Sequence, residues 1–202
     1  MLSANIDRTP EGVLTFAGYD VVKLAKQYGT PLYLMDEERI RANCRMYIQA
    51  FHKHFGWNAL PLYASKAASF RRIYQIMAEE GMGVDVVSSG ELYTALSAGF
   101  PAENIYFHGN CKTDADLTLG VQRGIGCFIV DNREELLSLD RIAGEAGVTQ
   151  KIMLRVTPGI DPHTYEAVST GKVDSKFGAA VETGQAMEQV KLALAQPHLS
   201  LR

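Results

Sequence analysis

The fold is decided by the stretch Leu60-Pro61-Leu62-Tyr63-Ala64-Ser65-Lys66-Ala67, in which a short apolar run ends in a lysine. The apolar part, Leu60–Ala64, predicts a buried strand, and apolar residues at helical spacing over Ser69–Glu80 predict an amphipathic helix after it. Lys66 is therefore expected at the carboxyl end of a strand. A lysine in that place either extends to solvent or, when its ammonium is buried, loses its proton readily and suits Schiff-base chemistry.

The same unit, a short apolar strand followed by an amphipathic helix, repeats along the chain. Alternation of this kind indicates parallel strands with both faces covered, as in an α/β barrel or a doubly wound sheet. Further strands are expected at Val84–Val87, Ile105–His108, Cys127–Val130 and Ile152–Val156, with helices at Gly90–Ala98, Thr113–Val121, Asn132–Ala146 and Thr183–Ala195.

The repeat is interrupted after the fifth strand and resumes at the end of the chain. Leu199–Leu201 has the pattern of a sixth strand, whereas a closed (β/α)8 TIM barrel needs eight strands and about 250 residues. The sequence therefore favours a fragment with the first five to six βα units of a TIM barrel over a complete open sheet. The long Thr157–Gly178 connection is rich in Gly, Pro, Thr, Asp and His, which is typical of a functional loop.

The first part of the chain does not follow this repeat. It is expected to hold an extended piece at Gly12–Phe16, a helix at Val21–Tyr28, a strand at Leu32–Met35, and a helix that Asp36 caps and that runs to about His54. We therefore expect an N-terminal segment, residues 1–30, and a partial barrel, residues 31–202.

Three of the expected helices carry a start signal, a capping side chain followed three residues later by an acid. We assign Ser88 and Glu91 to capping before any role in function. The three signals are Ser88-x-x-Glu91, Thr113-x-x-Asp116 and Asp131-x-x-Glu134.

Composition excludes several classes of function. The 202 residues are 47% hydrophobic and 21% charged with a net charge of −3, so the chain lacks the positive charge typical of proteins that bind nucleic acid or anionic membranes. Met1–Pro10 has no apolar signal region, and no run approaches the roughly 18 apolar residues that cross a bilayer, which indicates a cytoplasmic protein. Cys44, Cys111 and Cys127 are odd in number and scattered, so we expect no disulfide framework and no metal site.

Four chemistry-bearing residues, Lys66, Asp85, His108 and Arg155, stand at or near the carboxyl ends of different predicted strands. In a barrel these ends meet at one mouth, and an amine, a carboxylate, an imidazole and a guanidinium together suit an anionic cofactor that bears an aldehyde. Each residue also has a structural interpretation. Asp85 and Arg155 could neutralise each other as a buried pair, and His108 could be a hydrogen-bonded core histidine.

Seven short segments follow one another along the chain in the order of one known family. They are Gly12–Thr15, Tyr28–Tyr33, Tyr63–Ala67, Gly83–Leu92, His108–Asn110, Leu154–Val156 and Thr170–Gly178. Together they resemble the N-terminal half of the bacterial diaminopimelate decarboxylases, which belong to the fold-type III pyridoxal-phosphate enzymes. The resemblance extends from Gly12 to Arg202.

The resemblance implies an alanine-racemase-type TIM barrel, pyridoxal 5′-phosphate as cofactor, and the decarboxylation of meso-2,6-diaminopimelate to L-lysine. It matches Lys66 to the lysine that forms a Schiff base with the cofactor, and Asp85 and Arg155 to positions that line the cofactor pocket. Ala64 matches a small residue packed against the cofactor ring, and His108 belongs to a family motif. The alternatives are a related decarboxylase of ornithine, arginine or carboxynorspermidine, and a non-catalytic pyridoxal-phosphate-binding half-barrel.

The chain departs from the family pattern at Ala68, where many relatives carry asparagine, and at Tyr165, where a second histidine is common. Several family features would lie beyond Arg202: the histidine stacked on the cofactor, the glycine-rich phosphate site, the acid that protonates the pyridine nitrogen and the cysteine supplied by the partner subunit. The C-terminal β-domain, against which residues 1–30 are expected to pack, would also lie there. The resemblance thus implies a homodimer at full length, and weak cofactor affinity and negligible turnover for this chain alone.

Overall fold

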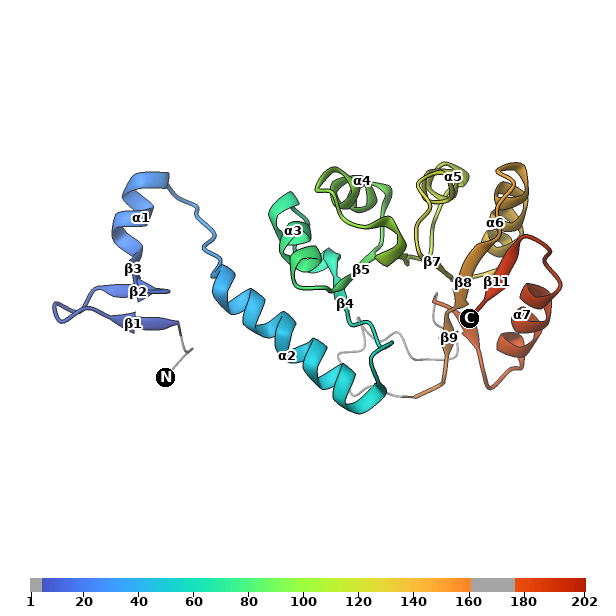
Figure 1. Ribbon diagram of the computed structural model, residues 1–202, viewed down its shortest axis with the longest axis horizontal. Helices are drawn as coiled ribbons and strands as arrows, with labels where there is room; N and C mark the ends of the chain where they lie inside the picture. Colours follow the sequence, from blue (N-terminus) through green and yellow to red (C-terminus); the bar gives the residue numbers. More distant parts are fainter. Residues whose placement is uncertain (1–4, 161–176) are drawn as a thin grey trace. The chain divides into compact units, whose positions relative to one another are not determined.

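The computed structural model of the chain describes residues 5–160 and 177–202. The chain forms two compact units, Met1–Ala50 and Phe51–Arg202, and helix α2 (Glu37–Phe55) passes from one to the other (Figure 1). The predicted domain boundary after residue 30 falls inside the first unit and stays a prediction. Within the described residues, every helix is too short or too polar to cross a bilayer.

Three of the sequence-based predictions fall wholly or mostly outside the described residues. The first two concern the functional loop predicted at Thr157–Gly178, of which the structure describes the first four residues and the last two, and the departure at Tyr165. The family segment that ends at Gly178 is likewise described for its last two residues alone.

The first unit is built on a small antiparallel sheet of three strands in the order β1-β2-β3. Helix α1 follows directly, and its N-cap Asp20 accepts hydrogen bonds from the backbone N–H groups of Val22 and Lys23. The bounds are β1 (Ile6–Arg8), β2 (Leu14–Phe16), β3 (Tyr19–Asp20) and α1 (Val21–Tyr28). These elements confirm the extended piece and the helix that the sequence predicts here.

The strand predicted at Leu32–Met35 is wrong, because these residues belong to no strand. The Tyr33 side chain is 96% exposed, so the apolar run is not covered as a core strand would be. An apolar run becomes a strand when a neighbouring strand completes its hydrogen bonds, and a local pattern does not report that neighbour. The cap of the next helix is confirmed, since Asp36 Oδ1 accepts the backbone N–H of Arg39 at 3.1 Å.

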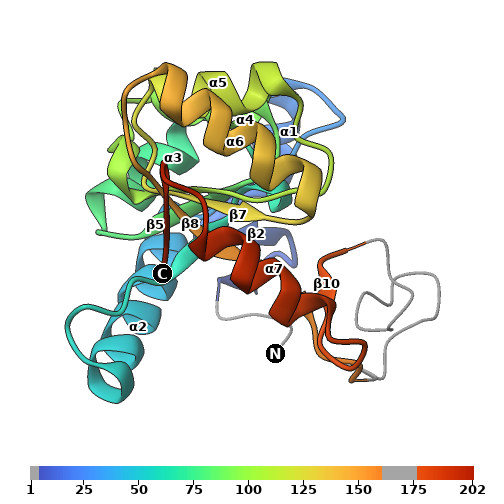
Figure 2. The ribbon, with the colours of Figure 1, turned by 90° about the vertical axis from the view of Figure 1, so that its right-hand side faces the viewer.

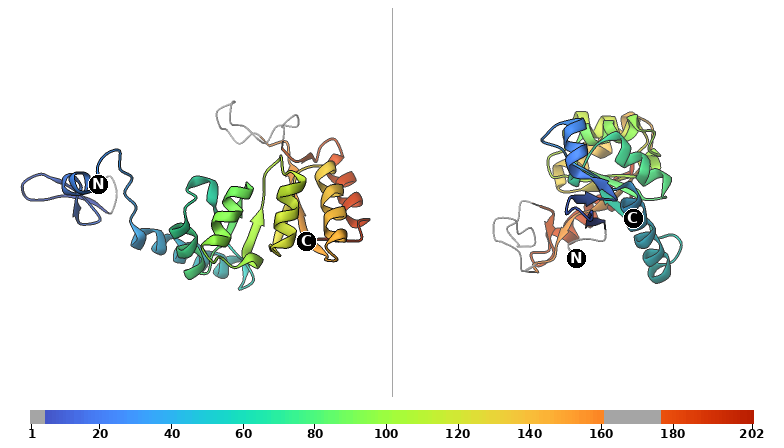
Figure 3. Two further views of the ribbon diagram at one scale, coloured as in Figure 1. Left: turned by 90° about the horizontal axis from the view of Figure 1, so that it is seen from above. Right: turned by 90° about the vertical axis from the view of Figure 1, so that its left-hand side faces the viewer.

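The second unit is a six-stranded parallel sheet in the order β4-β5-β6-β7-β8-β11, in which each strand lies beside the next one along the chain. A doubly wound sheet reverses this order at a switch point and carries helices on both faces. Here helices α3 to α6 follow one another over one face (Figures 1 and 2), and the helices of this unit stand side by side when seen from above (Figure 3, left). The six strands are therefore the first units of a TIM barrel, as predicted.

The observed strands and helices match the predicted ones to within a few residues. The strands are β4 (Leu62–Ala64), β5 (Gly83–Val86), β6 (Ile105–Phe107), β7 (Cys127–Val130), β8 (Gln150–Leu154) and β11 (Leu199–Leu201), and the helices are α3 (Arg71–Glu79), α4 (Ser89–Ser97), α5 (Asp114–Gln122), α6 (Arg133–Glu145) and α7 (Gln185–Leu194). Short pieces complete the unit: the 3₁₀ turns η1 (Ser65–Ala67) and η2 (Ala102–Asn104), and the paired strands β9 (Val156–Thr157) and β10 (Ala179–Ala180).

The hydrophobic core lies between this sheet and its helices. Phe107 and Phe128 pair in register across β6 and β7, their rings stack with centroids 5.7 Å apart, and neither side chain is exposed. Side chains on a strand alternate between faces. Asp85 and Tyr106, which pair across β5 and β6, accordingly lie on the opposite face and are half-buried.

The helix caps confirm two of the three predicted start signals and correct the third. Ser88 caps α4, and Thr113 forms a full capping box with Asp116 at the start of α5. At α6 the cap is Asn132, whose side chain accepts the backbone N–H of Glu135, so the predicted Asp131-x-x-Glu134 signal is wrong by one residue. Because Asn132 caps the helix, the carboxylate of Asp131 is left for another role.

Candidate active site

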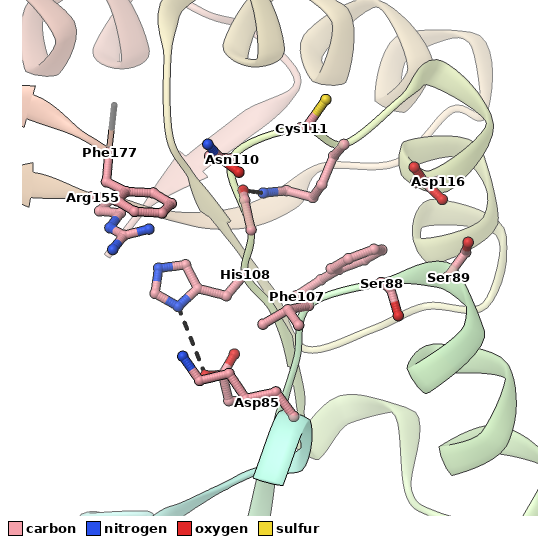
Figure 4. Close-up of a pocket in the computed structure, with 14 residues that line it drawn as sticks. Asp85, Ser88, Ser89, Phe107, His108, Asn110, Cys111, Asp116, Arg155 and Phe177 are labelled. Atoms are coloured by element: carbon pink, nitrogen blue, oxygen red, sulfur yellow. Dashed lines mark hydrogen bonds and ion pairs between the residues drawn. The ribbon is translucent and has the colours of Figure 1, made fainter. Parts of the chain in front are cut away.

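A cavity of about 490 Å³ opens at the carboxyl end of the parallel strands (Figure 4). Four of the five predicted site residues line it, and they come from the ends of four strands, as the barrel geometry requires. Its described lining residues are Lys66, Asp85, Val87, Ser88, Ser89, Phe107, His108, Gly109, Asn110, Cys111, Lys112, Asp116, Arg155 and Phe177. The fifth predicted residue, Ala64, is not among them; it lies on β4 in register with Asp85.

Lys66 is held at the cavity by the anchoring of its neighbour Ser65. Ser65 is fully buried, and its Oγ lies 2.6 Å from Glu91 Oε2 and 2.9 Å from the backbone carbonyl of Asp85. The same Glu91 oxygen accepts the backbone N–H of Val87 at 2.8 Å. The Ser88 side chain caps helix α4, and the Glu91 carboxylate fastens the turn that carries Lys66 to the end of strand β5.

Two lysines, Lys66 and Lys112, line the cavity, and their surroundings differ. The Lys112 side chain is 2% exposed, and its ammonium is engaged by Glu135 and by the carbonyls of Gly109 and Ile129. Lys66, in contrast, is exposed. Because the Lys112 ammonium donates two hydrogen bonds to backbone carbonyls and forms a buried ion pair with Glu135, Lys66 is the cavity lysine whose nitrogen is available to a ligand.

Asp85 and His108 form a polar pair on the cavity wall. His108 Nδ1 lies 3.8 Å from Asp85 Oδ2, an arrangement shown by the dashed line in Figure 4. The other two atoms of the pair, Asp85 Oδ1 and His108 Nε2, are buried and have no hydrogen-bond partner among the described residues. Buried polar atoms without partners are costly, so this wall is suited to receive a polar ligand.

Arg155 follows strand β8 and pairs with Asp131, not with Asp85 as the sequence left open. Arg155 Nη1 lies 3.3 Å from Asp131 Oδ1, and the guanidinium lies over the ring of Phe177 at 4.2 Å from its centroid. Asp131 Oδ2 also accepts the backbone N–H of Gly178 at 3.3 Å. The guanidinium is thus oriented by a carboxylate on one side and an aromatic face on another.

The residues that sequence reasoning missed are Asp131, Lys112 and Glu135. A signal for Asp131 was present, since it directly follows strand β7 just as the four predicted residues stand at or near strand ends. The sequence signals for the buried pair of Lys112 and Glu135 were weaker than the signal for Asp131. Their burial, 2% and 3% exposed, and the 2.9 Å between Lys112 Nζ and Glu135 Oε1 depend on tertiary packing.

Comparison with known proteins agrees with this geometry. The chain is 47% identical over 184 residues to a diaminopimelate decarboxylase of Bacillus methanolicus, covering 91% of this chain and 42% of that protein. It is 43% identical over 190 residues to the diaminopimelate decarboxylase of Bacillus subtilis, covering 94% and 43%. The crystal structure of the M. jannaschii diaminopimelate decarboxylase in complex with L-lysine matches with a TM-score of 0.86 at 35% identity, covering 98% of this chain and 46% of that one.

The chain thus spans less than half the length of the curated relatives it matches. A family model described as the pyridoxal binding domain of pyridoxal-dependent decarboxylases matches residues 38–202, which is most of the chain. The resemblance drawn from the sequence is confirmed: the chain belongs to the pyridoxal-dependent decarboxylase family, in its pyridoxal-binding domain.

Proposed function

We propose that the full-length protein, meaning this chain continued to the length of its curated relatives, decarboxylates meso-2,6-diaminopimelate to L-lysine. The bond between Cα and one carboxylate breaks, carbon dioxide leaves, and a proton takes its place at Cα. The observation that carries the proposal is the meeting of Lys66, Asp85, His108 and Arg155 in one cavity of a pyridoxal-binding domain. The diaminopimelate decarboxylases among its relatives support the choice of substrate.

The cavity fits pyridoxal phosphate, the cofactor of this family. Lys66 offers an exposed primary amine for the aldehyde. Two buried atoms, Asp85 Oδ1 and His108 Nε2, have no hydrogen-bond partner among residues 5–160 and 177–202. They are suited to form hydrogen bonds with a polar ligand. When bound, the cofactor supplies an electron sink for the pair of electrons left by departing carbon dioxide.

Each residue of the chain takes a distinct part in this proposal. Lys66 Nζ would hold the cofactor through its aldehyde carbon, with release of the aldehyde oxygen as water, and could move a proton at that nitrogen. Asp85 and His108 orient the ring from one wall, and the Arg155 guanidinium, held by Asp131, attracts anionic groups of cofactor or substrate. Ala64 lies in register with Asp85, and its small side chain would leave room for the cofactor ring beside strand β4.

We also propose that the full-length protein is a cytoplasmic homodimer in which residues 1–30 pack against a C-terminal β-domain. The three cysteines of the chain, Cys44, Cys111 and Cys127, are free thiols, which suits a reducing compartment. The dimer follows from the family pattern of active sites shared between subunits.

The proposal is tested by reducing the full-length protein with borohydride in the presence of pyridoxal phosphate, mapping the modified peptide, and identifying the reaction product. We expect a single adduct on Lys66 and release of lysine from diaminopimelate. Putrescine or agmatine formed from ornithine or arginine would instead favour a related decarboxylase. An adduct on Lys66 without any decarboxylation would favour the non-catalytic cofactor-binding protein, and no adduct would contradict the cofactor site.

The cysteines provide an independent probe of the cavity. Burial raises the pKa of the Cys127 thiol to about 11, and Cys44 is buried as well, whereas Cys111 is exposed and lines the cavity. Because the thiolate is the reactive form, we expect iodoacetamide at pH 8 to modify Cys111 long before Cys127. Pyridoxal phosphate should slow the labelling of Cys111, measured by peptide mass spectrometry over time. Pyridoxine, which lacks the aldehyde and phosphate, is the control; equal labelling with both compounds would place the cofactor elsewhere.

A further inference from the structure

The ammonium of Lys112 is fully engaged inside the protein. Its Nζ lies 2.6 Å from the carbonyl of Gly109, 3.1 Å from the carbonyl of Ile129 and 2.9 Å from Glu135 Oε1. It also lies 5.8 Å from the centroid of the Phe107 ring. Lys112 therefore ties the loop after β6, which begins with His108, to strand β7 and helix α6.

Glu135 extends this connection to the other side of the cavity. Its Oε2 accepts the backbone N–H of Asp131 at 3.1 Å, and the Asp131 carboxylate in turn pairs with Arg155 at 3.3 Å. The side chains of Asp131 and Glu135 are 2% and 3% exposed, so the two carboxylates in this line of contacts are buried. Two cavity residues far apart in sequence, His108 and Arg155, are thus connected through one buried ion pair.

The conformation of Gly109 allows the loop after β6 to lie close to the end of strand β5. Gly109 has φ +108°, and a Cβ at that position would lie 3.1 Å from the carbonyl oxygen of Val87. The backbone N–H of His108 donates to the carbonyl of Val86 at 2.8 Å. The loop that carries His108 is therefore fixed on one side by strand β5 and on the other by the Lys112 ammonium.

We propose that Lys112 and Glu135 are positioning residues for the active site. Lys112 holds the loop of His108 through the Gly109 carbonyl, and Glu135 holds Arg155 through Asp131. This inference rests on the proposed function. A buried ion pair adds little net stability over an apolar pair of similar volume, because desolvation of the two charges offsets their attraction. What the pair provides, and an apolar pair cannot, is directed contacts to the Gly109 carbonyl and the Asp131 N–H.

The test uses the full-length protein with both partners replaced, Lys112→Met together with Glu135→Met, so that no buried charge is left alone. The variant is expected to fold and to form the borohydride adduct on Lys66. Its kcat should fall about 10-fold to 100-fold with a smaller change in KM, since a misplacement of about 1 Å costs rates of that order. The pH profile of kcat and the absorption band of the bound cofactor should shift. Arg141→Met, which removes exposed ion pairs with Asp114 and Glu145, is the matched control and should change none of these.

A readout without cofactor or activity separates this inference from the proposed function. In the cofactor-free protein, the NMR chemical shifts of the His108 ring protons should change in the double variant because the ring moves relative to Asp85, its neighbour at 3.8 Å. If the double variant fails to fold, Glu135→Gln is the second variant. Lys112 and the Asp131 N–H contact different oxygens of Glu135, and the amide replaces one of these oxygens by NH2, so one contact is lost. The chemical shifts of the His108 ring should therefore change in the same direction by less.

Unchanged chemical shifts of the His108 ring in the folded variant would overturn the positioning role, whatever the activity. Absence of lysine formation by the wild-type protein would contradict the proposed function, and the NMR chemical shifts of the His108 ring would still decide the role of the pair.

Discussion

Replacing Lys66 by alanine in the full-length protein should abolish attachment of the cofactor and lower decarboxylation by about 10³-fold or more, the scale seen when a covalent catalytic group is lost. The reason is structural. The other cavity lysine, Lys112, has its ammonium directed at Glu135 and at two backbone carbonyls, and its side chain is 2% exposed. It cannot substitute for Lys66 without breaking a buried ion pair.

Three measurements check this expectation: absorbance of the bound cofactor, borohydride adduct mapping and lysine release. Lys66 is exposed, so its loss should leave the midpoint of thermal unfolding of the cofactor-free protein nearly unchanged. An unchanged unfolding midpoint is the control, because it shows that the activity is lost through missing chemistry and not through misfolding. A borohydride adduct on Lys112 in the variant, or retention of a substantial part of the activity, would show that the lysine was assigned wrongly.

Replacing Phe128 by alanine should destabilise the fold by about 3–5 kcal/mol, the range for truncating a buried aromatic side chain. Phe128 is fully buried, stacks on Phe107 with centroids 5.7 Å apart, and its ring closely approaches Gly120 on helix α5. The loss is a large share of the 5–15 kcal/mol that typically stabilises a domain. Urea unfolding of the full-length protein, followed by circular dichroism, measures it.

The next residue on the same strand provides the matched control. Ile129 points to the opposite face of the sheet and is half-buried, so Ile129→Ala should cost clearly less, on the order of 1–2 kcal/mol, because less apolar surface returns to water. Equal losses for the two variants would mean that the core is not concentrated between the sheet and helices α3 to α6.

The order of strands and helices was predictable because its signals are local. A short apolar run, the helical spacing that follows it and a capping residue such as Ser88 or Thr113 are all read within a few neighbours. The convergence of Lys66, Asp85, His108 and Arg155 was predictable for a related reason. In a barrel the carboxyl ends of the strands meet at one mouth, so position along each strand is enough to bring these residues together.

Local signals misled where a partner distant in sequence decides the outcome. Leu32–Met35 has the composition of a strand, yet no neighbouring strand completes its hydrogen bonds. Asp131 was interpreted as a cap, but Asn132 caps the helix and Asp131 is used by Arg155, 24 residues away. In both cases the chemical character of the residues was judged correctly, apolar for Leu32–Met35 and acidic for Asp131. The error lay in the expected interaction partner.

The sequence alone determined the succession of βα units, the family, and the side chains that can take part in the proposed chemistry. The tertiary structure decided which of two cavity lysines is available, which carboxylate holds Arg155, and that Lys112 and Glu135 form a buried ion pair. The physical reason is that burial and charge pairing are set by groups brought together across the sheet. A lysine with its ammonium in solvent and one with three buried acceptors look alike until the chain has folded around them.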